Sequence, residues 1–209
     1  MVDVKRVSKR TQKSRETRRK ILAAAGELFV ERGYGATNLQ DVADRAGVAV
    51  QTIYFVFGNK RTVLKELADI TIAGDDEPVA TMDRPWFKEA LASGTAGEHL
   101  RRHVHGTRLI LDRYAPMAKV IAAAAATDLE VADLWQYDED PRYVVQSAAA
   151  RSMMSKPGAR EGVTAKQAAD LLFGLLSPAL YLVFVEERDW SPKRWEDWVH
   201  RTLRDQLCQ

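Results

Sequence analysis

The stretch LQDVADRAGVAVQTIYFVFG, residues 39–58, decides the fold because it meets the steric demands of two short helices joined at a glycine turn. A small residue, Ala43, stands where a second helix would cross the first, and Gly47 follows where the backbone needs a left-handed conformation. Apolar residues fill the expected wedge between the helices: Val42, Ala46, Val48, Ile53 and Val56. The spacing of Ala43, Gly47 and Ile53 predicts a helix-turn-helix, although an ordinary corner between two helices remains open.

Helical periodicity extends from this motif toward the N-terminus. A helix is expected from about Ser14 to Arg32, ended by Gly33 and Gly35. Its apolar residues recur on one face: Ile21, Leu22, Ala25, Leu28 and Phe29. The motif itself supplies helices at about 39–46 and 50–57, and a fourth helix is expected at about 60–72.

The chain beyond residue 75 also has a helical pattern, after a polar, turn-rich segment at 74–83. The pattern predicts helices at about 95–114, from Pro116 through 122–126, at 128–137, at 140–155, at 164–187 with a kink at Pro178, and from Ser191 to 207. We therefore expect an all-α fold with three parts: a basic flexible arm at 1–14, a three-helix DNA-binding domain at 15–74 with its motif at about 38–57, and a larger helical domain at 75–209.

Charge is distributed unevenly along the chain. Residues 1–74 contain 14 Lys and Arg against 8 Asp and Glu, whereas residues 75–209 contain 17 against 21. Nine basic side chains lie in the first 20 residues: Lys5, Arg6, Lys9, Arg10, Lys13, Arg15, Arg18, Arg19 and Lys20. A basic arm before a folded unit commonly contacts phosphates, although a solubilising tail has the same composition.

Composition also restricts the compartment. The single cysteine, Cys208, leaves no internal disulfide, which fits a reducing compartment. The apolar run at 21–25 lacks a cleavage site, and no run approaches the roughly 18–20 apolar residues of a membrane span. We expect a cytoplasmic protein without a membrane segment.

Residues 18–67 resemble the N-terminal domain of tetracycline-repressor-like (TetR) regulators. The matching pieces are RRKILAAA at 18–25, ELF at 27–29, RGY at 32–34, AT at 36–37, DVADRAGV at 41–48 and TIYFVFGNK at 52–60. The resemblance implies a DNA-binding transcription regulator, acting as a repressor, which binds a pseudo-palindromic operator as a homodimer and is released by a small molecule.

The resemblance and the helical geometry together suggest which residues meet DNA. The helix at 50–57 would enter the major groove, where the Gln51 amide suits an adenine edge and Thr52 suits a phosphate or a thymine methyl. Thr37 is expected to cap the second helix near a phosphate, and Tyr54 and Lys60 occupy family positions that hold the sugar–phosphate backbone. The complete expected set is Thr37, Asn38, Val50, Gln51, Thr52, Tyr54, Phe55 and Lys60.

Two positions depart from the family pattern. Phe55-Val56 stands where many members have Tyr-His, and Ala49 stands where a serine often caps the recognition helix. We therefore expect fewer phosphate contacts from this region, offset by the basic arm.

The C-terminal half is expected to form the dimer and hold the effector. The resemblance places the dimer interface at about 164–207, and the apolar residues of 171–185 surround too much of one helix for a single core face. A buried helix in a monomer remains the alternative. The expected pocket for an apolar or aromatic effector comprises Trp86, Arg102, His103, Thr107, Tyr114, Met117, Trp135 and Tyr143.

Two other classes of function compete with this interpretation. His99 and His103 have a spacing that can bind a metal, but no third ligand follows at motif spacing. No nucleophile elbow or phosphate-binding glycine loop is present either, so we expect no enzyme, cofactor, catalytic residue or metal site. A helical protein that binds acidic partners through its basic arm is the second alternative.

Overall fold

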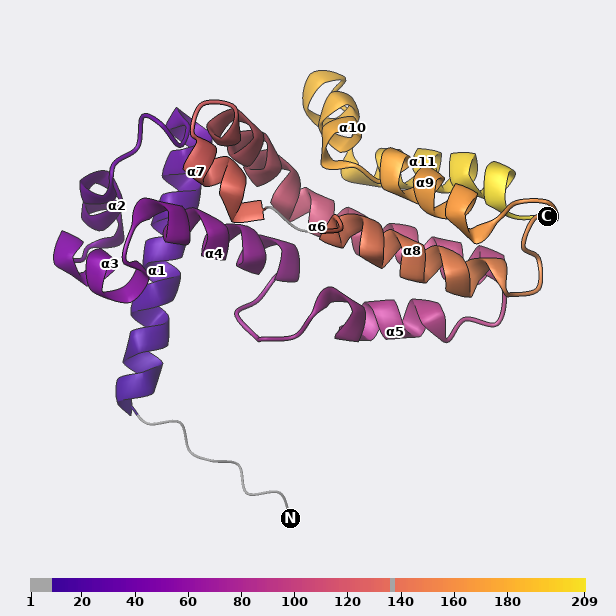
Figure 1. Cartoon of the computed structure of the whole chain (residues 1–209), viewed down its shortest axis with the longest axis horizontal. Coiled ribbons are helices and arrows are strands. Elements are labelled where there is room, and N and C mark those ends of the chain that lie inside the picture. The colour runs from indigo at the N-terminus through magenta and orange to yellow at the C-terminus, as the bar shows by residue number, and fades with distance from the viewer. Residues whose placement is uncertain (1–8, 136–137) are drawn as a thin grey trace, which may run out of the picture. The chain divides into compact units, whose positions relative to one another are not determined.

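The computed structural model describes residues 9–135 and 138–209, and throughout these ranges the regular elements are helices (Figure 1). This confirms the predicted all-α class. The elements are α1 (Lys9–Arg32), α2 (Leu39–Ala46), α3 (Val50–Phe57), α4 (Lys60–Ala73), η1 (Thr81–Asp83), α5 (Pro85–Leu91), α6 (Ala96–Ala125), α7 (Leu129–Ala132), η2 (Asp133–Trp135), α8 (Pro141–Met154), α9 (Ala165–Leu175), α10 (Pro178–Leu182), the π-helical turn η3 (Val183–Glu187) and α11 (Pro192–Leu207).

The chain divides into two compact units, each of which draws on separate segments. Unit 1 contains the described residues up to Asp69 together with Val120–Leu134, and unit 2 contains Ile70–Lys119 and Trp135–Gln209. α4 and α6 each contribute residues to both units, so a single cut in the sequence does not separate the two units. The predicted arm, DNA-binding domain and effector domain remain predictions, and residues 1–8 of the arm lie outside the described residues.

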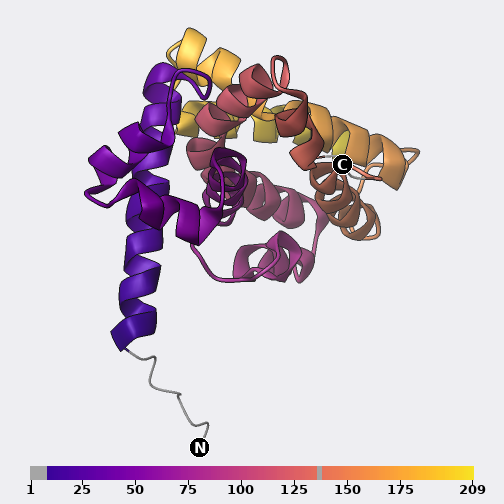
Figure 2. The same cartoon turned by 60° about the vertical axis from the view of Figure 1, so that its left-hand side comes forward.

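Unit 1 is built around the buried face of α1. Figure 2 shows α2 and α3 beside the C-terminal half of this long helix. All five residues predicted for its apolar face are buried: Ile21, Leu22, Ala25, Leu28 and Phe29. Val42, Ala43 and Ile53 from α2 and α3 are completely buried, so the predicted wedge between the two helices is closed at its centre.

The turn between α2 and α3 has the backbone conformation that the sequence predicts. Gly47 has φ 67° and ψ 39°, which is left-handed, and the Val48 amide donates to the Ala43 carbonyl at 3.0 Å. α2 starts at a capping box, because Asn38 Oδ1 accepts from the Asp41 amide and Asp41 Oδ2 accepts from the Asn38 amide. The expected cap, Thr37, is wrong: its hydroxyl is buried and donates to the Gly33 carbonyl at 2.9 Å.

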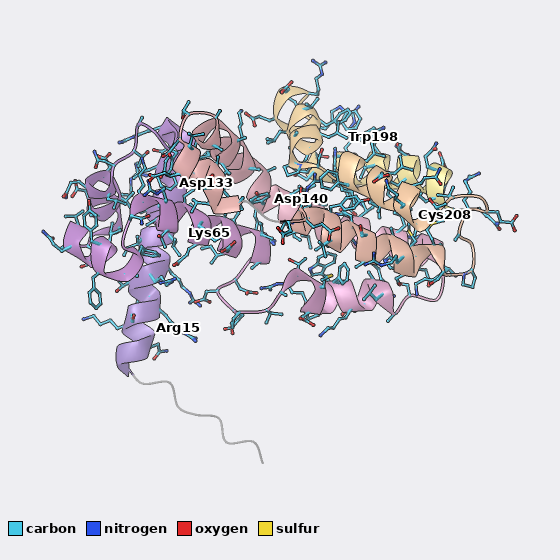
Figure 3. All side chains as sticks on the ribbon, viewed as in Figure 1. Arg15, Lys65, Asp133, Asp140, Trp198 and Cys208 are labelled. Carbon is cyan, nitrogen blue, oxygen red and sulfur yellow. The ribbon has the colours of Figure 1, made fainter. Side chains whose placement is uncertain are left out.

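Segment 120–134 also belongs to unit 1, although residues 70–119 of unit 2 separate it in sequence from Asp69. Arg61 of α4 forms an ion pair with Glu130, and Lys65 donates to the Leu134 carbonyl at 3.3 Å. Figure 3 shows Lys65 next to the segment that carries Asp133. The helix expected at 128–137 is described as far as Trp135, as α7 followed by η2, and residues 136–137 lie outside the described residues.

Unit 2 is a helical core with one proline inside a helix. The predicted restart at Pro116 is wrong, because α6 runs without a break from Ala96 to Ala125. The residues on either side of Pro116, Ala115 and Met117, are both buried. Packing on both sides of the proline therefore holds the helix across the missing hydrogen bond.

At Pro178 the chain does more than kink. α9 ends at Leu175, and Ser177 caps a new helix by accepting from the Leu180 amide at 3.2 Å, with Pro178 in its first turn. The predicted bend near Pro178 is present, at 42°, but the continuity predicted over 164–187 is wrong, because α9 and α10 are separate helices. Proline is favourable at a helix start, where its missing N–H costs nothing.

The other departures concern the ends and number of helices. α1 begins at Lys9 rather than near Ser14, and α5 at 85–91 was not predicted as a separate helix. Among the described residues, no single helix is long and apolar enough to cross a lipid bilayer, and α9 with the α10–η3 segment reaches that length only as a bent pair.

We predict that Gly47→Ala destabilises the chain by about 1–2 kcal/mol through backbone strain, since an alanine side chain disfavours the left-handed conformation. No atom lies within 4 Å of the added Cβ, so the cost comes from the backbone alone. Gly35, which has an open Cβ position and no positive φ, is the matched control. Urea unfolding of both variants measures the difference, and equal stabilities would contradict the prediction.

Candidate nucleic-acid interface and ligand cavity

α3 presents an exposed face that is largely apolar. Ile53 and Phe57 are buried, whereas Gln51 and Tyr54 are exposed, and Phe55 has 92% of its surface accessible. Val50 and Thr52 are half-buried at the start of the helix. The Phe55 side chain buries little apolar surface within its own chain, so it contributes little to folding stability. Its exposed position on a short helix suits contact with another molecule.

The N-terminal turn of α3 lacks a side-chain cap. Ala49 has extended backbone angles but offers no acceptor to the first amides of the helix. Amide donors at a helix start attract anions. Ala49 stands where a serine often caps this helix, so the first amides of α3 lack a side-chain acceptor from their own chain.

Lys60 contacts its own chain. Its ammonium lies 4.0 Å from the centre of the Tyr34 ring and donates to the Tyr34 carbonyl oxygen. Burial lowers the pKa of Lys60 from its ordinary value. These contacts fix the side chain at the start of α4, and its predicted phosphate contact stays a prediction.

Many basic side chains of unit 1 are engaged in ion pairs. Arg18 pairs with Glu66, and Arg45 bridges Glu27 at 2.9 Å and Glu31 at 3.3 Å. Arg15 is exposed and projects from the N-terminal part of α1 (Figure 3). The basic residues Lys5 and Arg6 of the predicted arm lie outside the described residues.

Unit 2 contains a cavity of about 250 Å³ at the end of α4. Its walls combine charged and apolar groups from the end of α4, the following loop, α5 and α6: Ala73, Gly74, Asp75, Arg84, Pro85, Trp86, Gly106, Leu109, Ile110 and Arg113. Trp86 is the predicted effector residue that borders this cavity.

The structure distributes the other predicted effector residues among several environments. Arg102 is exposed and donates to the Glu89 carbonyl at 3.0 Å, and the Tyr143 hydroxyl donates to Asp170 at 2.8 Å. The remaining members are buried or half-buried: His103, Thr107, Tyr114, Met117 and Trp135. Apart from Trp86, their roles stay predictions.

Two buried imidazoles lie within the same helix. His103 Nε2 is 2.7 Å from Gln146 Oε1, while both ring nitrogens of His99 lack a protein partner. Burial lowers the pKa of each histidine to about 4, well below 6.5. Among residues 9–135 and 138–209, no cluster of three or more His, Cys, Asp or Glu side chains is arranged to hold a metal ion.

Part of the sequence of unit 1 matches a family model. Residues 21–67 match the model of the bacterial regulatory proteins of the tetR family. Over these residues the chain is similar to the TetR-like regulators. The matched relatives include proteins named as HTH-type transcriptional regulators.

Individual proteins extend the TetR likeness. The chain is 37% identical over 123 residues to the HTH-type transcriptional activator FasR of Mycolicibacterium smegmatis, a match over 54% of this chain and 56% of FasR. The chain thus spans about half the length of this curated relative.

Two solved structures share the fold. A transcriptional regulator from Saccharomonospora viridis, in complex with choline, is 20% identical with a TM-score of 0.69, covering 93% of this chain and 99% of that one. The SmeT–triclosan complex is 21% identical with a TM-score of 0.69, covering 92% of each chain.

Sequence reasoning missed Arg84, Gly106 and Arg113 among the residues that line the cavity. One signal was present, because a glycine inside a helix is costly and calls for a packing reason. A Cβ on Gly106 would lie 2.1 Å from Trp86 Cε3, so the indole rests directly on α6. The arginines gave no comparable signal among 31 basic residues.

We predict that the folded state loses stability as the pH falls from 6.5 toward 4, since His99 and His103 stay neutral in the fold while unfolded histidines take up protons. Replacing His99 with Phe keeps a ring of similar size and removes one such group, so the decline becomes shallower. Urea unfolding at about pH 7 and about pH 5 measures this slope. An unchanged slope in His99→Phe would show that burial of this imidazole does not govern it.

Proposed function

We propose that this chain is a ligand-responsive DNA-binding repressor that binds a pseudo-palindromic operator as a homodimer and is released by a small apolar or aromatic effector. The observation that supports this most strongly is the rigid turn at Gly47, which holds α3 with Gln51, Tyr54 and Phe55 exposed. An eight-residue helix with an exposed face suits the major groove, which admits an α-helix.

Base reading is assigned to α3. The Gln51 amide donates and accepts together, which suits the edge of adenine. Phe55 offers only apolar surface, and the apolar group that a base pair presents in the major groove is the thymine methyl. The helix carries no charged residue, so it lacks the arginine or lysine that commonly reads guanine. We therefore expect thymine and adenine at the positions that α3 contacts.

Backbone contacts are assigned to the surroundings of α3. The uncapped amides after Ala49 and the exposed hydroxyl of Tyr54 suit phosphate oxygens. We assign further backbone contacts to Thr52, Asn38 and Lys60. In this arrangement Val50 would lie at the edge of the major groove. Thr37 contributes through its position in the turn, since its hydroxyl is already engaged inside unit 1. The basic arm supplies further charge.

A homodimer through about 164–207 accounts for apolar surface that unit 2 does not bury. Leu172 and Leu176 are buried, while Leu171, Leu175 and Leu180 are half-buried and Val183 is 39% exposed. A helix that is apolar on several sides needs more than one covering surface. Two subunits would also present two copies of α3 to the two halves of a palindrome.

The position of α4 in the chain supports release by an effector. This helix contributes residues up to Asp69 to unit 1 and from Ile70 to unit 2. A ligand that favours one placement of α4 would change the spacing of the two reading helices, and a coupling of about 1–3 kcal/mol changes DNA affinity roughly 5–150-fold. The complexes of similar folds with choline and triclosan support a small-molecule ligand.

Activation is the second candidate, because FasR is named a transcriptional activator. The same binding to DNA serves both outcomes, which depend on where the operator lies relative to the promoter. A reporter gene under the chain's own upstream DNA separates them: repression lowers its expression when the protein is supplied, and activation raises it.

The DNA-binding proposal predicts tight, salt-sensitive binding to the DNA upstream of the chain's own gene, measured by fluorescence anisotropy. Gln51→Ala should relax base preference at one position in each half-site, at a cost of about 1–3 kcal/mol. Gln40→Ala removes the same side chain from the exposed face of α2 and serves as the matched control. If wild-type protein binds this DNA no better than unrelated duplex, the proposal fails.

The thymine contact predicts sensitivity to a single methyl group. Replacing half-site thymines with uracil keeps every base-pairing edge but removes the methyl, and should weaken wild-type binding about fourfold per contacted base. Phe55→Ala should bind thymine and uracil operators alike, whereas Tyr54→Phe retains the discrimination. Equal loss on uracil substitution in wild type and Phe55→Ala would assign the methyl contact to another residue.

A further inference from the structure

The cavity of unit 2 carries one positive charge in excess. Among its lining residues, Arg84 donates through Nη1 and Nη2 to the two carboxylate oxygens of Asp75, at 2.7 and 2.9 Å. This pairing holds the pKa of Asp75 at about 2, so both groups stay charged and balance each other. Arg113, the third charged residue of the lining, is left over in this balance.

Arg113 is hydrogen-bonded to the end of α4. Its Nε donates to the Thr71 carbonyl at 3.2 Å and its Nη2 to the Ile72 carbonyl at 3.3 Å. Gly74, with φ 85°, permits this approach, because a Cβ there would lie 2.9 Å from Nη2. The guanidinium therefore caps α4 with one edge, while Nη1 makes none of the described hydrogen bonds. Arg113 remains exposed to solvent, and partial desolvation lowers its pKa.

The cavity lining also contains apolar groups. The Trp86 indole lies against Gly106, and Pro85, Leu109 and Ile110 are further lining residues. The volume of about 250 Å³ exceeds the roughly 150 Å³ that suffices for a benzene ring in a protein interior. The space therefore fits one ring or a short chain with a small polar group.

We propose that this cavity binds a small organic carboxylate, with the carboxylate on Arg113 and the apolar body against Trp86. The inference deepens the proposed ligand response and rests on it, by naming the site and the ligand class. A carboxylate suits a guanidinium, and it balances the excess charge of the lining. Because the same guanidinium caps α4, a bound anion favours the form in which the last turn of this helix is ordered.

The test compares two probes of equal shape on the full chain by ¹⁹F NMR titration: 4-fluorobenzoate and its uncharged counterpart 4-fluorobenzamide. The carboxylate should bind about tenfold more tightly than the amide, and Arg113→Gln should abolish this preference. Arg101→Gln neutralises an exposed arginine on the same helix and should leave it intact. Equal affinities for the two probes, or an unchanged preference in Arg113→Gln, would overturn the inference.

Hydrogen exchange tests the link to α4. Saturating 4-fluorobenzoate should slow amide exchange at residues 70–74 several-fold in the wild type, because the bound form keeps Arg113 on the carbonyls. Arg113→Lys keeps the charge but cannot make the same two-carbonyl contact, so it should retain the preference for benzoate and lose the slowing. This variant also tests the inference if Arg113→Gln fails to fold. Loss of the preference in folded Arg113→Lys, or faster exchange in the wild type, would contradict it.

Neither measurement involves DNA. Absence of carboxylate binding in a chain that binds its operator overturns the ligand inference alone. Absence of operator binding in a chain that binds 4-fluorobenzoate overturns the DNA-binding proposal alone.

Discussion

The left-handed turn at Gly47 is the constraint on which the reading surface of unit 1 depends. With φ 67°, this residue ends α2, and Ala43 in α2 is completely buried, as a small residue at a helix crossing should be. Ile53 and Phe57 are then buried, and Gln51, Tyr54 and Phe55 face outward. The exposed set is thus a geometric consequence of one backbone conformation.

The turn between α2 and α3 was predictable because its determinants are local. The small residue Ala43, the turn glycine and the apolar wedge all lie within residues 42–56, so sterics link them without tertiary information. Longer elements were less predictable. Pro116 lies inside a helix while Pro178 begins one, and the difference is set by burial around Pro116 and by the cap at Ser177, which the residue type proline does not reveal.

The candidate site residues differ in the same way: those set by local geometry were predictable, and those set by contacts distant in sequence were not. Exposure along α3 follows from helical periodicity, so its outward residues were found from sequence. Thr37 and Lys60 have polar groups that suit DNA, but the fold gives the Thr37 hydroxyl to Gly33 and places the Lys60 ammonium on Tyr34. For the effector pocket, the sequence allowed aromatic and polar residues of 75–209 to be grouped by residue type only. It did not show which of them lie close together in the fold. The cavity depends on Gly106 accepting an indole and on Arg113 reaching α4, and such contacts link residues distant in sequence.

The charges of unit 1 indicate how affinity and specificity divide in the proposed DNA complex. α3 has no charged side chain, so it adds shape and base contacts but little of the counterion release that makes DNA binding tight. Arg18 and Arg45 are already paired with carboxylates, which reduces their attraction for phosphate. The salt-dependent part of the affinity must then come mainly from other basic groups, such as Arg15 at the exposed end of α1 and the arm before it. On this division, changes on α3 alter which sequence is bound, whereas changes in the basic end alter how tightly any sequence is bound.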